Sequence, residues 1–356
     1  KMRYNTRTRV YPVDPVNPAP GIIAIAAHAI RDGRLVAFPT ETVYGLGADA
    51  TRIEAIGRIF AAKQRPTTDP IIVHIATFEQ LDQVAVEIPP IARQLADRFW
   101  AGALTMILKR SDHIPAIVSA GRETVAVRMP SHPVAQALIR AAGVPIAAPS
   151  ANTFSRPSAT TAAHVLDDLD GHVDVILDGG AARIGLESTV IDLTLDVPTV
   201  LRPGGVTLEA LRTVIPNVET RERYIDVETG EAAASPGEML KHYAPNARLL
   251  LIDGDATAAN ARIRQLAAEF SAKDERVGIL APDEETALFA GSSAKVIGIG
   301  SRDDLAQIGV GLFGSIRRID AAEVDVILIR SLPREGLGAA IWDRLVRAAE
   351  GHVIYV

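Results

Sequence analysis

The feature that most constrains the fold is a change of pattern between residues 218 and 246. This stretch begins charged and irregular, and its later part, Glu231-Ala-Ala-Ala-Ser-Pro-Gly237, lacks amphipathic periodicity. With 356 residues, the chain is also longer than one domain usually is. We therefore predict two domains, residues 1–217 and 247–356, joined by a linker at 218–246.

Both predicted domains mix helices and strands. After the linker, strands are expected at 248–253, 276–281, 295–300 and 324–329, with helices at 256–270 and 337–350. Strands that alternate with helices indicate a small parallel α/β sheet, which is Rossmann-like. Before the linker, helices are expected at 21–31 and from Pro90, and strands at 35–39, 105–109, 125–129 and 173–177. The fold class is α/β, with α+β character in the first domain.

Missing residue types and motifs exclude several classes of protein. The chain has no cysteine, which rules out disulfides, thiolate zinc sites and cysteine nucleophiles. Walker A, H-E-x-x-H and G-x-S-x-G motifs are absent. Gly45-Leu-Gly47 and Gly336-Leu-Gly338 are only fragments of a dinucleotide fingerprint, and each is predicted to be a turn.

Apolar patterning predicts a cytoplasmic protein without membrane attachment. The apolar run at 21–30 is shorter than the roughly 20 residues that a membrane helix needs. No apolar run follows the N-terminus, so a signal peptide is not expected.

The charges argue against a broad nucleic-acid surface. Residues 1–217 contain 21 basic and 21 acidic side chains, and residues 218–356 contain 16 and 22. Proteins that bind nucleic acid broadly usually have a basic surplus, which neither part has. Only three of the first 21 basic residues are lysines, and arginine is favoured where planar anions are recognised.

Two of the five segments that suggest chemistry lie early in the chain. Phe38-Pro-Thr-Glu-Thr-Val-Tyr-Gly-Leu-Gly47 places Thr40 and Thr42 after a strand, where their hydroxyls would face whatever lies over the sheet edge. Taken alone, this segment is more typical of a local turn. Lys63 and Arg65 precede Pro66, and an extended segment would direct both cations to one anion. A solvated charged loop is the alternative.

The other three segments add arginines and hydroxyls. Arg128 ends an apolar strand, so we expect it to be half-buried beside a carboxylate of the protein or of a ligand. Ser150 and Asn152 begin a hydroxyl-rich loop that leads to a helix near residue 161, a suitable place for an anion. Ser188 and Arg202 complete the set. With Arg156, these segments predict a pocket for a polyphosphate and a carboxylate-bearing substrate.

In this order, the segments resemble the YrdC family of L-threonylcarbamoyladenylate synthases. The similarity covers roughly residues 24–206 and centres on Lys63, Arg65, Ser150 and Asn152. Ser235-Pro-Gly237 and His242-Tyr-Ala-Pro245 resemble the linker of the two-domain members. The resemblance implies a twisted, mostly mixed sheet with an open concave face, followed by a smaller Rossmann-like domain.

The resemblance also implies a reaction and its site. Threonine, bicarbonate and ATP with Mg²⁺ would give threonylcarbamoyl-AMP and pyrophosphate, without an organic cofactor. A separate transferase would pass the threonylcarbamoyl group to the adenosine beside the tRNA anticodon. The residues implied for ATP are Lys63, Arg65, Asp69, Thr124, Ser150, Asn152, Ser158, Arg202, His242 and Tyr243, with Lys63 and Arg65 catalytic. Those implied for threonine are Thr42, His74, Arg128, Ala148 and Ser188.

Two other functions remain open at this stage. A concave cationic face could bind structured RNA without chemistry, although the balanced charge favours at most a weak RNA contact. Another carbamoyl or adenylyl transferase could use the same pocket for a different amine. The amine dependence of pyrophosphate release and the salt dependence of RNA binding would separate these possibilities.

Overall fold

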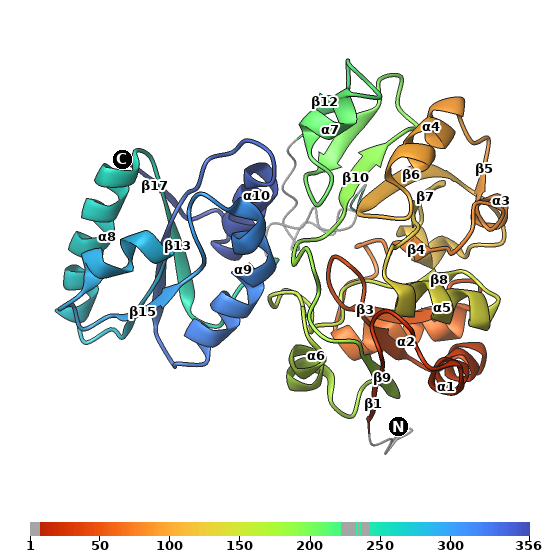
Figure 1. The fold of residues 1–356 in the computed structure, drawn as a ribbon, viewed down its shortest axis with the longest axis horizontal. Helices are drawn as coiled ribbons and strands as arrows, with labels where there is room; N and C mark the ends of the chain where they lie inside the picture. Colours follow the sequence, from red (N-terminus) through yellow and green to blue (C-terminus); the bar gives the residue numbers. More distant parts are fainter. Residues whose placement is uncertain (1–7, 222–232, 234, 236–241) are drawn as a thin grey trace. The chain divides into compact units, whose positions relative to one another are not determined.

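A computed structural model describes residues 8–221, 233, 235 and 242–356. They form two compact units (Figure 1), of which the second contains Ser155–Pro157 together with the chain from residue 242 onwards. Most of the predicted linker, residues 222–232, 234 and 236–241, lies outside this description. The boundaries at 217 and 247 therefore stay a prediction.

The first unit is built on a mixed sheet of 12 strands, in agreement with the predicted fold class. The strands are β1 (Arg9–Pro12), β2 (Val36–Phe38), β3 (Gly45–Asp49), β4 (Val73–His74), β5 (Ala85–Val86), β6 (Leu104–Arg110), β7 (Thr124–Arg128), β8 (Ile146–Ala147), β9 (Val175–Asp178), β10 (Thr189–Asp192), β11 (Thr199–Arg202) and β12 (Glu219–Thr220). Their order is β1-β9-β2-β3-β8-β4-β7-β6-β10-β11-β12, and β5 pairs with β6. For example, β1 and β9 are parallel, whereas β6 and β7 are antiparallel.

Seven α-helices are described in the first unit. They are α1 (Pro20–Arg31), α2 (Ile53–Lys63), α3 (Leu81–Val84), α4 (Pro90–Phe99), α5 (Pro133–Ala142), α6 (Ala162–Leu169) and α7 (Leu208–Arg212), and a 3₁₀ turn η1 covers Ala116–Ser119. Prolines begin α1, α4 and α5, where the missing N–H of proline costs no intrahelical bond. The hydroxyl of Thr161 caps α6, as the sequence suggested.

Strand alternation divides the side chains of this sheet between two cores. Met106, Leu108 and Val127 belong to a large core on one face. On the opposite face, α1 and α5 cover Val36 and Ile146. Farther along that second face lies a small apolar cluster of Ile72, Ile107, Ala126, Val190 and Leu201. His74, Arg128 and Thr105 lie on this same face.

The predicted turn at Gly45-Leu-Gly47 is wrong, because these residues form strand β3. A Cβ atom on Gly47 would lie 2.7 Å from the ring of Phe38 and 2.8 Å from Ile146. Glycine is therefore needed here for close packing across strands rather than for a turn. Gly336, by contrast, has a φ of +58° just before helix α10 (Gly338–Ala348), so a turn is present there.

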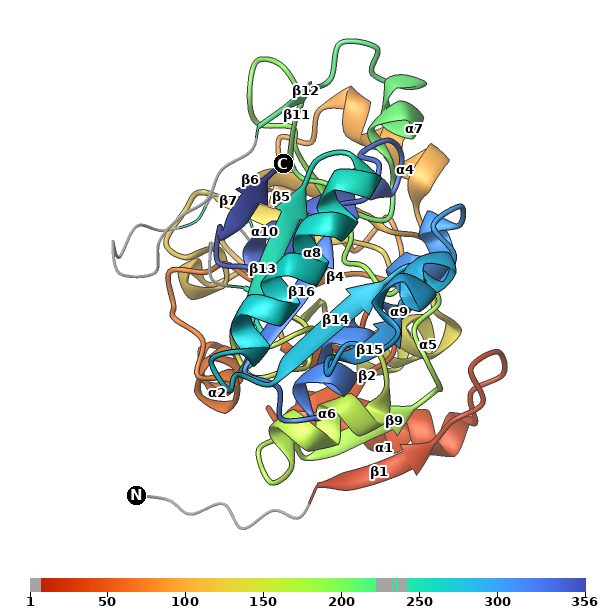
Figure 2. The same cartoon turned by 90° about the vertical axis from the view of Figure 1, so that its left-hand side faces the viewer.

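The second unit is an all-parallel sheet of five strands, again as predicted. Its order is β15 (Lys295–Gly298), β14 (Val277–Ala281), β16 (Val326–Arg330), β13 (Arg248–Asp253) and β17 (Val353–Tyr355). Helix α8 (Ala256–Ser271) packs on one side, and α9 (Leu305–Asp320) and α10 lie on the other (Figure 1). A 3₁₀ segment, η3, spans Asp283–Phe289. Figure 2 shows α8 in front of the sheet, running roughly along β13.

Helix α9 was not predicted, because its three glycines weaken the sequence signal for a helix. Burial decides the conformation: Leu312, Phe313, Ile316 and Ile319 of α9 are all inaccessible to solvent. None of the described helices has the length and apolar character needed to cross a membrane.

Candidate active site

One row of paired residues crosses five neighbouring strands of the first unit. His74 on β4 pairs with Arg128 on β7, and Arg128 pairs with Thr105 on β6. Thr105 pairs with Val190 on β10, which pairs with Arg202 on β11. Paired residues of neighbouring strands share a face of a sheet. Side chains predicted to bind two different substrates therefore come together on one face.

Arg128 is the centre of this row and is more buried than predicted, with only 4% of its surface exposed. Its Nη2 donates to Glu41 Oε1 at 2.7 Å, and its Nη1 donates to Thr42 Oγ1 at 2.8 Å. Its Nε donates to the Gly102 carbonyl at 3.2 Å. The carboxylate that a buried arginine requires is thus supplied by Glu41.

The sequence left open whether Thr40 and Thr42 form a local turn or face a ligand, and the structure gives the two residues different contacts. The hydroxyl of Thr40 accepts from the main-chain N–H of Thr42 and of Val43, and it donates to the Val43 carbonyl. Thr40 is therefore a local turn residue. Thr42, with no exposed surface, is the residue that contacts Arg128.

Ser188 links the remaining members of the row. Its hydroxyl lies 2.7 Å from the hydroxyl of Thr105, and Arg202 Nη2 donates to both its carbonyl and its hydroxyl, at 2.9 and 3.2 Å. Arg202 is 4% exposed at the end of β11. The structure thus joins two predicted residues, Ser188 and Arg202, through contacts that sequence alone does not show.

Lys63 joins the K-x-R and S-x-N segments. Its ammonium donates to the Ser150 carbonyl at 2.6 Å and also to the Asn152 carbonyl. The expectation that Lys63 and Arg65 lie in one extended segment is wrong, because Lys63 ends helix α2 and Gln64 has a left-handed backbone with φ of 54°. Arg65 itself is not helical, in agreement with the restriction that Pro66 imposes on it.

Two further pairs, each with at least one predicted ATP residue, are buried close to these segments. Arg65 forms an ion pair with Asp69 at 2.9 Å and also donates to the carbonyls of Asp69 and Pro70. Ser158 donates to the carboxylate of Glu187 at 2.5 Å. Each predicted ATP residue in these pairs therefore has a defined protein partner.

His74 is a buried member of the row. Among the residues that the structure describes, Nδ1 of His74 has no hydrogen-bond partner. Burial, together with the charge of Arg128, lowers the pKa of His74 to about 3. The imidazole is therefore neutral at physiological pH, and it meets the ring of Phe38 edge-on at 6.2 Å.

Ala148 and Thr124 lie on strands or loops next to the row. The N–H of Ala148 donates to the Ile72 carbonyl at 2.9 Å, so this stretch is fixed beside β4. Thr124 begins β7 and is half-buried, two and four residues from Ala126 and Arg128 on the same face.

His242 and Tyr243 belong to the second unit, as does Arg156. Tyr243 is fully buried, with a φ of 62°, and its ring lies 5.2 Å from that of Phe313. Arg156 pairs with Asp320 at 2.9 Å.

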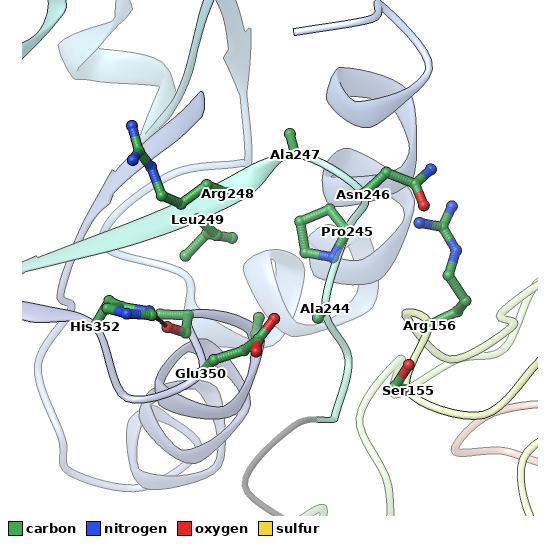
Figure 3. Close-up of a pocket in the computed structure, with 12 residues that line it drawn as sticks. Ser155, Arg156, Ala244, Pro245, Asn246, Ala247, Arg248, Leu249, Glu350 and His352 are labelled. Carbon is green, nitrogen blue, oxygen red and sulfur yellow. Dashed lines mark hydrogen bonds between the residues drawn. The ribbon is translucent and has the colours of Figure 1, made fainter. Parts of the chain in front are cut away.

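A cavity of about 390 Å³ occupies the second unit near Arg156 (Figure 3). Its lining also includes residues 244–249, 348–350, Ser155 and His352. Of the cations predicted to form the polyphosphate pocket, only Arg156 is among the residues that line this cavity. The row on the first unit is therefore the stronger candidate for an active site.

Three residues of the candidate site were not assigned from the sequence: Glu41, Thr105 and Glu187. Glu41 carried a usable signal, because a carboxylate between two threonines in an apolar segment is a suitable partner for a buried arginine. Thr105 and Glu187 become visible only once strand pairing and loop packing are known. Across the described part of the chain, no three His, Asp or Glu side chains are grouped to hold a metal ion.

Two protein-family models match the chain. Residues 28–204 match the family described as telomere recombination (Sua5, YciO and YrdC), and residues 206–350 match the C-terminal domain of threonylcarbamoyl-AMP synthase. Threonylcarbamoyl-AMP synthase of Pyrococcus abyssi is 44% identical over 337 residues, covering 94% of this chain and 96% of the relative. The Bacillus subtilis enzyme is also 44% identical, over 93% of this chain and 94% of the relative.

Solved structures give the same result. The crystal structure of P. abyssi Sua5 in complex with L-threonine has a TM-score of 0.90 and 42% identity, covering 98% of this chain and 99% of that one. The fold and these relatives therefore define a two-domain nucleotidyltransferase. The chain belongs to the threonylcarbamoyl-AMP synthase family, in its Sua5-type form with a YrdC domain and a C-terminal domain. Like its relatives, it is an ATP-using synthase.

Proposed function

We propose that the face carrying Arg128 converts L-threonine, bicarbonate and ATP into threonylcarbamoyl-AMP and pyrophosphate. The observation that supports this most is the buried contact of Arg128 with Thr42 and Glu41, set beside the Thr105–Ser188 pair. A cation and several hydroxyls on one face suit an amino acid that carries both a carboxylate and a hydroxyl group.

Threonine would be held by Thr42, His74, Arg128, Ala148 and Ser188. Arg128 would pair with the α-carboxylate, since a guanidinium matches its planar geometry. The neutral imidazole of His74 adds no charge, so its unpartnered Nδ1 would serve as a hydrogen-bonding atom. Support for threonine as the substrate comes from the P. abyssi relative, which was solved with L-threonine bound.

ATP would be held by the residues around the K-x-R and S-x-N segments. These are Lys63, Arg65, Asp69, Thr124, Ser150, Asn152, Ser158 and Arg202. Lys63 fixes the carbonyls of Ser150 and Asn152, so one side chain organises the loop against which phosphates would lie. Positioning of this kind accounts for much of the catalysis in phosphoryl and nucleotidyl transfer.

The chemistry requires no covalent intermediate on the enzyme. The amine of threonine attacks bicarbonate and, with loss of water, forms a carbamate. A carbamate oxygen then forms a bond to the α-phosphorus while the bond to the pyrophosphate oxygen breaks. We assign Lys63 and Arg65 to the stabilisation of negative charge that develops in this step.

Mg²⁺ would arrive with ATP rather than reside in the protein. Mg²⁺ is commonly bound by substrate phosphates with one or two carboxylates. Asp69 and Glu187 are buried carboxylates beside residues assigned to ATP, so they could provide such contacts. The ion would neutralise charge on the leaving pyrophosphate.

His242 and Tyr243 would complete the nucleotide site from the linker. The only adjacent histidine and tyrosine of this sequence are these two residues. A solved variant of the P. abyssi relative has an adjacent histidine and tyrosine both replaced by alanine, and its structure is 41% identical to this chain with a TM-score of 0.90.

The product would serve tRNA modification in the cytoplasm. Threonylcarbamoyl-AMP is an activated acyl donor, so a separate transferase would pass its threonylcarbamoyl group to the adenosine beside the anticodon.

Pyrophosphate release tests this proposal. Purified protein is assayed with ATP and Mg²⁺, omitting threonine and bicarbonate in turn, with serine replacing threonine as a further arm. We expect release to require both co-substrates and to be faster with threonine. Release without either one, or no release under any combination, would contradict the proposed reaction.

A further inference from the structure

The guanidinium of Arg128 is held by three separate acceptors, and the one carboxylate among them, that of Glu41, has no assigned part in the reaction. We propose that Glu41 is a positioning residue, which fixes Arg128 so that its remaining donors are reserved for the α-carboxylate of threonine. This inference rests on the proposed contact between Arg128 and threonine.

The hydrogen-bond count of Arg128 supports it. A guanidinium has five N–H donors: one on Nε and two on each terminal nitrogen. Gly102 takes the donor on Nε, Thr42 takes one on Nη1, and Glu41 takes one on Nη2. One donor then remains on each terminal nitrogen, and two such donors suit a planar group with two oxygens.

Glu41 is itself held in place at both oxygens. Oε1 accepts from Arg128 at 2.7 Å, and Oε2 accepts from the main-chain N–H of Ser131 at 3.0 Å. Both side chains of the pair are only 4% exposed. Glu41 therefore connects Arg128 rigidly to the backbone that follows strand β7.

Glu41 remains ionised in this setting. Burial would raise the pKa of Glu41, but the charge and hydrogen bonds of Arg128 and the N–H of Ser131 hold it below its usual value. An ionised carboxylate accepts at both oxygens, whereas a glutamine accepts at only one. In Glu41→Gln, the new amide NH₂ group would therefore face another donor, either the N–H of Ser131 or the Nη2 of Arg128.

The test compares L-threonine with L-threoninamide, which lacks the carboxylate charge. Binding of each to wild-type protein and to Glu41→Gln is measured by isothermal titration calorimetry, with ATP as a third ligand. We expect Glu41→Gln to weaken L-threonine about 10- to 100-fold, the usual cost of charge-assisted hydrogen bonds. Binding of L-threoninamide and of ATP should change less than about threefold, because neither uses the remaining donors of Arg128.

The outcomes separate this inference from the proposed function. If the wild-type protein binds L-threonine and L-threoninamide equally, the contact between Arg128 and the carboxylate is wrong. If the wild type prefers L-threonine but Glu41→Gln weakens both ligands equally or leaves both unchanged, the positioning inference is wrong. Should Glu41→Gln fail to fold, Glu41→Asp carries the same comparison, because the shorter side chain cannot reach both Arg128 and Ser131.

Glu285→Gln is the matched control. Glu285 is also a buried carboxylate on an arginine, with its oxygens 2.6 and 2.7 Å from nitrogens of Arg330, and it lies in the second unit. The substitution should lower the melting temperature but leave the affinity for L-threonine unchanged. A merely structural effect of losing a buried carboxylate would look the same in both variants.

Discussion

Buried cations occur in both units of this molecule, and two from each unit show contrasting partners. In the first unit, Lys63 and Arg202 donate to main-chain carbonyls and a hydroxyl. In the second unit, Arg330 and Arg347 donate to the carboxylates of Glu285 and Asp343. A carboxylate neutralises the cation it binds, whereas a carbonyl or hydroxyl positions the cation without neutralising it. The acceptor alone does not separate a substrate-binding cation from a structural one, because Arg65 and Arg128 of the first unit also contact carboxylates.

The largest effect on this comparison should come from Arg330→Met. This substitution leaves Glu285 buried without its principal partner, which typically costs about 3–5 kcal/mol of stability. Urea denaturation followed by circular dichroism would measure the loss. Pyrophosphate release at low denaturant should stay close to that of the wild type, and a matching loss of activity would contradict the structural assignment.

Lys63→Ala should show the opposite of Arg330→Met, a loss of activity rather than of stability. Removing one positioned donor should cost on the order of 3 kcal/mol of transition-state stabilisation, or about 100-fold in pyrophosphate release. The fall should appear mainly in kcat, measured at saturating ATP and threonine. If pyrophosphate release stays near normal, the catalytic assignment of Lys63 is wrong.

The fold was more predictable than the site. The strands of the second unit follow from continuous apolar runs, and strand 248–253 coincides with β13. By contrast, the contact of Thr105 with Ser188 joins residues 83 positions apart, so only the strand order reveals it. Lys63 was misplaced in an extended segment because the helix that ends at this lysine is fixed by packing of Ile56, Ile59 and Phe60 rather than by a local signal.

His74 should make the stability of the first unit depend on pH. Its pKa of about 3 in the folded protein lies below its ordinary value of 6.5, so between these values only the unfolded chain binds the proton. Stability from this residue is complete above pH 6.5 and falls as the pH drops towards 3. Between pH 7 and 5 the loss should be about 2 kcal/mol.

His74→Gln should remove that part of the acid sensitivity. Free energies of unfolding for the wild type and the variant, measured at pH 7 and pH 5, isolate the contribution of this one residue from that of other buried groups such as His132. An equal loss in both proteins would show that His74 is protonated in the folded state.

The smallest effects should not distinguish the two units. Thr161 caps α6 in the first unit, and Asp255 caps α8 in the second. Each alanine substitution should cost about 1 kcal/mol, because capping depends on one local hydrogen bond. Thermal melting of Thr161→Ala and Asp255→Ala checks this. A much larger loss at either position would indicate a contact beyond the cap.

The row of paired residues also determines when the enzyme can first be active. Its members come from positions 74, 105, 128, 190 and 202, and β1 pairs with β9 across 166 positions of sequence. Pairings so distant in sequence slow folding, because the entropy of loop closure is lost before the contacts form. A chain emerging from the ribosome therefore has no complete row until residue 202 is available. Threonine can stabilise the first unit only after the strands that carry this row have paired.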